Sequence, residues 1–128
     1  MTQGDCFFGR GVGDTGKSVV LEYPSGSSGF PWHNDHQSLD RAGKPIPPSR
    51  LDPHLAYELA SRTYGAMALL TDGSEYEGGD LLVRRDSEVV AMPRERGTVI
   101  VFPSDTEHSV TPVEGGTRRC CVNFFRWA

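Results

Sequence analysis

The chain has 128 residues, of which 37% are hydrophobic and 23% are charged, and its formal net charge is −4. A chain of this length supports one hydrophobic core, so we expect residues 1–128 to form a single domain. The acidic balance argues against nucleic acid as a partner. A membrane partner is not expected either, because no apolar run approaches the ~20 residues that span a bilayer.

The N-terminal residues and the cysteines predict a cytoplasmic location. Residues 1–5 (MTQGD) include neither the basic cluster nor the apolar stretch of a secretory signal. The three cysteines, Cys6, Cys120 and Cys121, are an odd number with an adjacent pair, which makes a poor disulfide framework. We expect thiols in a reducing compartment, with one of the adjacent pair buried and the other half exposed.

Residues 11–18 (GVGDTGKS) match the phosphate-binding pattern G-x-x-x-x-G-K-[ST]. That motif requires a helix directly after it, because the helix N-terminus helps to hold the phosphate. Here the following residues 19–23 (VVLEY) are typical of a strand, and residues 24–26 (PSG) are typical of a turn. We therefore expect a strand over residues 18–23 and no nucleotide site.

The next segments combine a short strand with a long polar connection. We expect a strand over residues 30–35, followed by a connection over residues 36–61 that is long enough to be an inserted loop or a substrate lid. Within this connection, Asp52 suits the N-cap position of a helix and Pro53 suits its first position. These signals predict a helix over Pro53–Ser61.

The rest of the chain has the pattern of a β-protein. Short apolar runs bounded by turn residues predict strands over residues 63–71, 78–84, 88–92, 97–102, 108–113 and 117–127. Many short strands with little helix indicate a sandwich or a barrel. Because the candidate metal ligands fall on separate strands, we expect an all-β jelly roll with one short helix.

Three side chains are candidate metal ligands. Alternate residues of a strand share a face, so His33 and Asp35 can aim at one point. His108 is the best third ligand, and two imidazoles with one carboxylate leave the open positions of a non-haem Fe(II) oxygenase. Structural zinc takes four ligands, but His36 would point away from Asp35, and His54 begins the predicted helix. Without further context, a simple structural pairing of these side chains remains the alternative.

Arg118 supplies that context, because it follows His108 by ten residues. We expect the two residues on strands joined by a turn over residues 114–116 (EGG). A partly buried guanidinium among apolar neighbours calls for a carboxylate, and a bidentate pair is the strong form of that contact. The alternative is a structural salt bridge to an acidic residue of the chain itself. The neighbouring Arg119 should face the other way, as a surface charge.

Five sequence blocks that include these residues occur in the same order in the 2-oxoglutarate/Fe(II) dioxygenases. The blocks are His33-x-Asp35, residues 76–81 (YEGGDL), residues 97–104 (GTVIVFPS), His108-x-Val110-x-Pro112-Val113 and residues 116–118 (GTR). From about residue 18 to residue 127 the chain resembles this superfamily. Within the superfamily it is most similar to the prolyl-4-hydroxylase and PKHD-type hydroxylase branch.

The resemblance implies a fold and a set of site residues. The fold is a double-stranded β-helix, which is a cupin-like jelly roll. Iron would be bound by His33, Asp35 and His108, and Arg118 would bind the distal carboxylate of 2-oxoglutarate. These four are the implied catalytic residues. Tyr23 matches a family tyrosine near the co-substrate, with an ordinary core aromatic as the alternative interpretation.

The implied activity is hydroxylation of an unactivated C–H bond with Fe(II), 2-oxoglutarate and O₂. Succinate and CO₂ are released, and ascorbate is a candidate stimulant. Because Asp35 leaves no ligand position for a halide, hydroxylation is favoured over halogenation. The substrate would be a prolyl peptide, an amino acid or a small metabolite. The alternative function is a non-catalytic jelly-roll module that binds metal.

Two departures from the family pattern leave questions open. The family often has a second co-substrate tyrosine where this chain has residues 68–70 (ALL). The helices that usually precede the core are missing, so a compact member, a trimmed domain and a homodimer all remain open.

Overall fold

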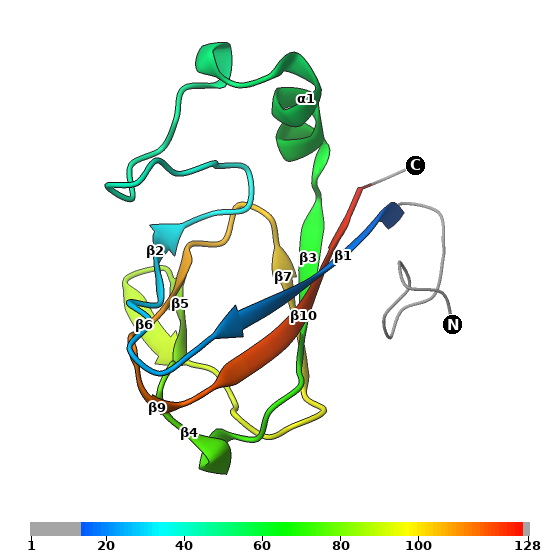
Figure 1. The fold of residues 1–128 in the computed structure, drawn as a ribbon. Coiled ribbons are helices and arrows are strands. Elements are labelled where there is room, and N and C mark those ends of the chain that lie inside the picture. Colours follow the sequence, from blue (N-terminus) through cyan, green and yellow to red (C-terminus); the bar gives the residue numbers. More distant parts are fainter. Residues whose placement is uncertain (1–13, 127–128) are drawn as a thin grey trace.

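Two antiparallel sheets enclose the core in the computed structural model, which describes residues 14–126 (Figure 1). The first sheet has the strand order β1 (Asp14–Tyr23), β10 (Arg118–Phe125), β3 (Tyr64–Leu69), β7 (Val99–Pro103). The second has the order β2 (Phe30–His33), β8 (His108–Val110), β5 (Leu81–Arg85), β6 (Glu88–Ala91). A two-stranded sheet pairs β4 (Tyr76–Gly78) with β9 (Val113–Gly116). The helical elements are α1 (Pro53–Ser61) and two 3-10 turns, η1 (Pro48–Arg50) and η2 (Gly73–Glu75).

The path of the chain between the sheets is that of a jelly roll. The chain leaves the first sheet after β1, returns to it for β3, crosses to β5 and β6, and then passes through β7, β8 and β10 with a change of sheet each time. The strand pairs of the described residues are all antiparallel. The predicted all-β jelly roll, a double-stranded β-helix with one short α-helix, is confirmed.

The core fills the space between the two four-stranded sheets. β3 lies between β10 and β7, and its residues 65–69 are buried. Met67 and Leu69 from this strand meet Leu81 and Val83 from β5 in one apolar cluster. Full burial of one such side chain contributes ~1.5–3 kcal/mol. The cluster therefore fixes the two sheets, and the candidate site residues on them, relative to each other.

Two strand pairings determine where the candidate site residues lie. In the first sheet, Tyr23 on β1 is the pairing partner of Arg118 on β10. In the second sheet, His33 on β2 is the partner of His108 on β8. Directly opposite residues of an antiparallel pair place their side chains on the same face. Each pairing thus brings together two residues that are far apart in the sequence.

Helix α1 covers one end of the molecule, beyond the ends of the strands (Figure 1). The Asp52 side chain accepts hydrogen bonds from the backbone N–H groups of His54 (2.9 Å) and Leu55 (3.3 Å). Such an N-cap contributes ~1 kcal/mol. Near the other end of the helix, Nδ1 of His36 lies 2.8 Å from the carbonyl oxygen of Leu59. The predicted helix is confirmed with the same bounds.

Three expectations from the sequence need correction. β2 ends at His33, so Asp35 lies in a turn and not on the strand. Residues 114–116, expected as a simple turn, belong to β9 because this segment pairs with β4. Cys120 is a buried free thiol, whereas Cys121 is also buried and is disulfide-bonded. The expectation of a half-exposed thiol beside Cys120 is therefore wrong.

β1 begins at Asp14 and includes Lys17 and Ser18, the last two residues of the phosphate-loop pattern. The pattern therefore continues into a strand, as predicted, and no helix N-terminus follows it. Residues 11–13 of the pattern and Cys6 lie outside the described residues. Within residues 14–126, no helix has the length and apolar character that a bilayer crossing requires.

Candidate metal centre

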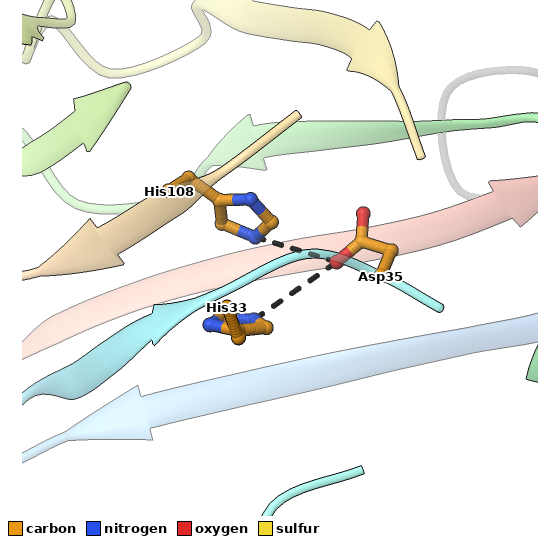
Figure 2. Close-up of side chains that lie close together, drawn as sticks. All are labelled: His33, Asp35 and His108. Atoms are coloured by element: carbon orange, nitrogen blue, oxygen red, sulfur yellow. Dashed lines mark ion pairs between the residues drawn. The ribbon is translucent and has the colours of Figure 1, made fainter. Parts of the chain in front are cut away.

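Three potential metal ligands converge between the ends of β2 and β8 (Figure 2). His33 ends β2, His108 begins β8, and Asp35 follows two residues after His33. One ligand atom from each lies within 4.8 Å of the other two. Nε2 of His108 is 3.3 Å from Oδ1 of Asp35, and Nε2 of His33 is 4.0 Å from the same oxygen. Because His108 and Asp35 are buried, a cation here would be held largely out of water.

Hydrogen bonds to the backbone fix the orientation of both imidazoles. Nδ1 of His33 lies 2.7 Å from the Pro31 carbonyl oxygen, and Nδ1 of His108 lies 2.9 Å from the Thr106 carbonyl oxygen. A carbonyl oxygen can only accept, so each Nδ1 carries the proton, and Nε2 of the neutral ring presents a lone pair. This is the arrangement typical of histidines that bind metals. Both lone pairs are directed toward Asp35.

Asp35 reaches the histidines from the turn that follows β2. Its backbone N–H donates to the Ser104 carbonyl oxygen (2.9 Å), and Nη1 of Arg62 donates to its backbone carbonyl oxygen (3.1 Å). Gly65 leaves room for the carboxylate, because a Cβ there would lie 3.1 Å from Oδ2 of Asp35. The sequence identified Asp35 correctly as a neighbour of the histidines, but the expected reason was wrong. The turn, and not the alternation of side chains along a strand, directs its carboxylate toward them.

The two histidines differ in their electrostatic surroundings. Burial lowers the pKa of His33, and the charge of His108 lowers it further. Burial also acts to lower the pKa of His108, but Asp35 outweighs it and raises that pKa, because its carboxylate accepts a hydrogen bond from Nε2 of the protonated ring and attracts its charge. A proton on His108 and a metal ion would compete for the same Nε2 lone pair. Metal binding here should therefore strengthen as the pH rises.

A cavity of about 220 Å³ adjoins the three ligands. Its walls come from both sheets and include Leu21, Tyr23, Phe30, Met67, Val110 and Phe124. Two further polar side chains, Gln37 and Arg62, also line it. Sequence reasoning missed both of these residues, because neither belongs to a motif and only the fold places them here.

A larger hollow of about 620 Å³ lies between the β5–β6 hairpin and β7. None of the three candidate ligands lines it, and its rim carries acidic and basic side chains together. Although this hollow is larger, its size does not make it a candidate metal site, because the three ligands lie elsewhere.

Arg118 lies directly behind the cavity wall and is 1% exposed. Its guanidinium carbon is 5.3 Å from the centroid of the Tyr23 ring. Its Nη1 contacts Sγ of Cys120 and its Nη2 contacts Sδ of Met67, each at 3.5 Å, while Nε has no hydrogen-bond partner. Among residues 14–126 no carboxylate pairs with it, so the alternative of an internal salt bridge is not observed there.

Tyr23 contributes a neutral phenol beside this guanidinium. Burial, together with the charge of Cys120, raises the pKa of Tyr23 to about 12, although Arg118 acts to lower it. The hydroxyl therefore keeps its proton at neutral pH and can donate a hydrogen bond. Tyr23 belongs to the buried core cluster, and it also lines the cavity and is paired with Arg118 across β1 and β10.

The remaining predicted positions lie away from the ligand cluster. His36 is exposed on the loop after Asp35. The His54 side chain is 78% exposed and pairs with Glu58 at 3.1 Å. Arg119 is exposed, with Nε 3.4 Å from the carboxylate of Glu22. As the sequence predicted, none of these side chains joins the ligand cluster.

A sequence model of the 2OG-Fe(II) oxygenase superfamily matches residues 18–127. The chain belongs to this superfamily. A PKHD-type hydroxylase from Synechococcus sp. (strain CC9902) is 37% identical to it over 109 residues, which cover 84% of this oxygenase chain and 40% of the relative. Another, from Azoarcus sp. (strain BH72), is 35% identical over 77 residues, or 60% of this chain and 33% of the relative. The match thus spans well under half the length of these curated relatives.

Solved structures show the same fold as this oxygenase chain. A Pseudomonas putida prolyl-4-hydroxylase superposes with a TM-score of 0.61 at 22% identity, covering 87% of this chain and 52% of that one. A prolyl hydroxylase from Trichoplax adhaerens, solved in complex with a hypoxia inducible factor peptide fragment, gives a TM-score of 0.60 at 19% identity and covers 86% and 43%.

The superfamily uses Fe(II) and 2-oxoglutarate, and the residues of this oxygenase chain fit both. Two imidazoles and one carboxylate suit Fe(II) and leave open coordination positions. A buried guanidinium without a carboxylate partner suits a ligand that brings one. The donor set and the unpaired Nε of Arg118 are thus consistent with the cofactor and the co-substrate of the family.

Proposed function

We propose that the protein is an Fe(II)- and 2-oxoglutarate-dependent dioxygenase that hydroxylates an unactivated C–H bond. One observation carries the proposal: the ligand atoms of His33, Asp35 and His108 converge beside a cavity that Arg118 backs, and no carboxylate of residues 14–126 pairs with this arginine. When bound, Fe(II) and 2-oxoglutarate supply the oxidising chemistry with O₂, and the products are the hydroxylated substrate, succinate and CO₂.

In this proposal His33, Asp35 and His108 would hold the metal and leave further positions free for the co-substrate and O₂. The Nδ1 contacts of His33 and His108 hold Nε2 in place before the metal arrives, which reduces the cost of organising the site. Asp35 fills the position that a halide would need, and this supports hydroxylation over halogenation. The buried ligand set also keeps competing water away from the open positions.

Arg118 and Tyr23 are proposed to bind 2-oxoglutarate. The guanidinium can form a bidentate pair with the distal carboxylate, which fixes the length and orientation of the bound molecule. Tyr23 can donate its phenol proton to the same ligand from the cavity wall. Residues 68–70 provide no hydroxyl, so these two side chains carry more of the recognition than they would beside a second tyrosine.

The substrate is proposed to enter under the segment formed by residues 36–61. This segment contains η1 and α1, and Gln37 from it lines the cavity, which supports its role as a lid within a single oxygenase domain. The apolar walls favour an amino-acid-like group of modest size. A prolyl group on a peptide is the first choice, because two proteins of the same fold are prolyl hydroxylases.

Further partners follow from the same proposal. The acidic chain is not expected to bind nucleic acid, and a homodimer remains a candidate assembly. Ascorbate would act as a stimulant by keeping iron ferrous. We propose the cytoplasm as the compartment, because it would keep both the ferrous ion and the Cys120 thiol reduced. The disulfide at Cys121 argues the other way, so recovery of that disulfide from cells under non-reducing conditions would contradict this location.

Succinate formation tests the activity directly. Protein with Fe(II), 2-oxoglutarate and O₂ should form succinate, faster with a prolyl peptide than without one. His108→Ala should abolish the reaction, because two ligands hold the metal far more weakly than three. His54→Ala is the matched control, since His54 is exposed and lies outside the cavity, and it should keep the rate. If the protein binds metal but forms no succinate with prolyl peptides, with free amino acids or without added substrate, a non-catalytic metal-binding module is favoured instead.

A further inference from the structure

Sulfur atoms are the hydrogen-bond acceptors of the Arg118 guanidinium. Sγ of Cys120 lies 3.5 Å from Nη1 and Sδ of Met67 lies 3.5 Å from Nη2. Thiol and thioether sulfurs are weak acceptors, and Nε has no partner at all. Cys120 has no exposed surface and Arg118 has 1%. A full positive charge is thus buried with little compensation, which is costly unless a partner arrives.

Met67 stands between this guanidinium and the cavity. Its side chain lines the cavity beside Tyr23, and its sulfur touches Arg118. Arg118 itself does not line the cavity, so a carboxylate that approaches Nη2 from the cavity meets the Met67 side chain and its sulfur contact first. Methionine suits such a position, because its unbranched side chain has several rotatable bonds and can repack.

We propose that Met67 and Cys120 are positioning residues for the co-substrate: their sulfurs hold the guanidinium of Arg118 in place and then yield to the distal carboxylate of 2-oxoglutarate. This inference rests on the proposed function and deepens it. An oxygen acceptor in either place would pair with Arg118 permanently and compete with the ligand. A purely apolar pair would leave the guanidinium without orientation. Weak acceptors orient the N–H donors of Arg118, and breaking their hydrogen bonds when the carboxylate binds costs little free energy.

The test uses the full chain loaded with Mn²⁺, which binds such sites without turnover, and calorimetry of 2-oxoglutarate binding. Met67→Gln places an amide oxygen, a strong acceptor, on a side chain of similar length. Its dissociation constant for 2-oxoglutarate should rise about tenfold or more, because a hydrogen bond to a charged group must now be broken. Met67→Leu, the matched control, keeps the volume and removes one of the two sulfur acceptors; because Cys120 still orients the guanidinium, its dissociation constant should rise by about threefold at most.

Pyruvate separates an effect on Arg118 from a general disturbance of the cavity. It has the keto acid group of 2-oxoglutarate but no distal carboxylate, so its affinity should be the same in all variants. Cys120→Ser provides a second test on the other nitrogen and should weaken 2-oxoglutarate binding in the same direction. Mn²⁺ affinity, measured in each variant, reports that the fold is intact.

Three results would overturn the inference alone. The first is that Met67→Gln and Cys120→Ser both bind 2-oxoglutarate as tightly as the unaltered protein. The second is that Met67→Leu loses as much 2-oxoglutarate affinity as Met67→Gln. The third is that the variants lose pyruvate affinity in parallel with 2-oxoglutarate affinity. Failure of the unaltered, Mn²⁺-loaded protein to bind 2-oxoglutarate would overturn the proposed function together with this inference.

Discussion

Arg94 and Arg118 both lie close to residues 76–79, but their guanidinium groups have opposite kinds of partner. Each packs near a tyrosine, with Arg94 4.4 Å from the Tyr76 ring centroid and Arg118 5.3 Å from that of Tyr23. The two terminal nitrogens of Arg94 donate four hydrogen bonds to oxygen: to the carbonyls of Gly78 (2.8 Å), Gly73 (3.1 Å) and Tyr76 (3.0 Å) and to the Asp80 carboxylate (2.6 Å). Within residues 14–126, the terminal nitrogens of Arg118 donate only to sulfur atoms.

The difference distinguishes an arginine that builds the fold from one that is kept for a ligand. Arg94 joins η2, β4 and the start of β5, so its donors are consumed by the protein itself. Arg118 is more deeply buried, yet its charge has no carboxylate partner among the described residues. A buried polar group that the protein leaves unsatisfied is a candidate functional group. Substitutions at the two arginines and at their partners test this distinction.

Arg118→Met should give the largest effect, and it should appear in binding and not in stability. A charge-assisted, bidentate contact is lost, so 2-oxoglutarate affinity of the Mn²⁺-loaded protein should fall by about 100-fold or more. The free energy of unfolding should stay level or increase, because an unpaired buried charge is replaced by an apolar side chain. Calorimetry and urea unfolding measure the two quantities. A strongly destabilised protein with normal affinity would reverse the assignment.

Arg94→Met is the matched change at the structural arginine and should act on stability instead. Four hydrogen bonds are lost, and three backbone carbonyls lose a donor, so the free energy of unfolding should fall by roughly 2–4 kcal/mol. The folded fraction should bind 2-oxoglutarate with unchanged affinity. If this variant lost co-substrate binding while keeping its stability, the two arginines would not differ as described.

Asp80→Asn sharpens the comparison by removing the one carboxylate that pairs with Arg94. The three carbonyl partners remain, and both side chains are partly exposed, so the expected loss is only about 1 kcal/mol. Urea unfolding at low and high salt measures it, and the loss should shrink as salt screens the pair. A loss as large as that of Arg94→Met would mean that the ion pair with Asp80, and not the three carbonyl hydrogen bonds, accounts for the stabilisation by Arg94.

Asp72 gives the smallest effect, a pH dependence of stability in the segment that contacts the Arg94 loop. Hydrogen bonds from the backbone of Arg96 and from Ser74 lower the pKa of Asp72 to about 2, from an ordinary value of 3.8. A lowered pKa stabilises the folded state above the ordinary value, and this contribution is lost as the pH falls through about 2. Asp72→Asn should therefore be slightly less stable than the unaltered protein at pH 5 and equal to it below pH 2. An equal stability difference at both pH values would show that the charge has no part in it.

The sequence predicted the parts of this molecule that depend on local chemistry. The cap at Asp52 and the proline after it gave the helix with correct bounds, and glycine and proline turns separated most of the strands. The strand β4 and the pairing of β9 were missed, because both are short and depend on a partner far along the chain.

The candidate site was predictable only where a motif marks it. His33, Asp35, His108, Tyr23 and Arg118 were selected from spacing and resemblance, and the fold brings them to one region. Met67, Gln37 and Arg62 carry no motif, and their places follow from strand register and packing. The turn that aims Asp35 was also invisible in the sequence, because the alternation of a strand predicts the same pair of residues.

A crystal structure of the protein with Mn²⁺ and 2-oxoglutarate tests the central claim most directly. The account predicts Mn²⁺ bound to Nε2 of His33, Nε2 of His108 and the carboxylate of Asp35, with the distal carboxylate of 2-oxoglutarate paired to Arg118. It also predicts that the Met67 sulfur has moved away from that guanidinium. A metal bound elsewhere, or a distal carboxylate directed to solvent while Arg118 keeps its two sulfur contacts, would contradict it.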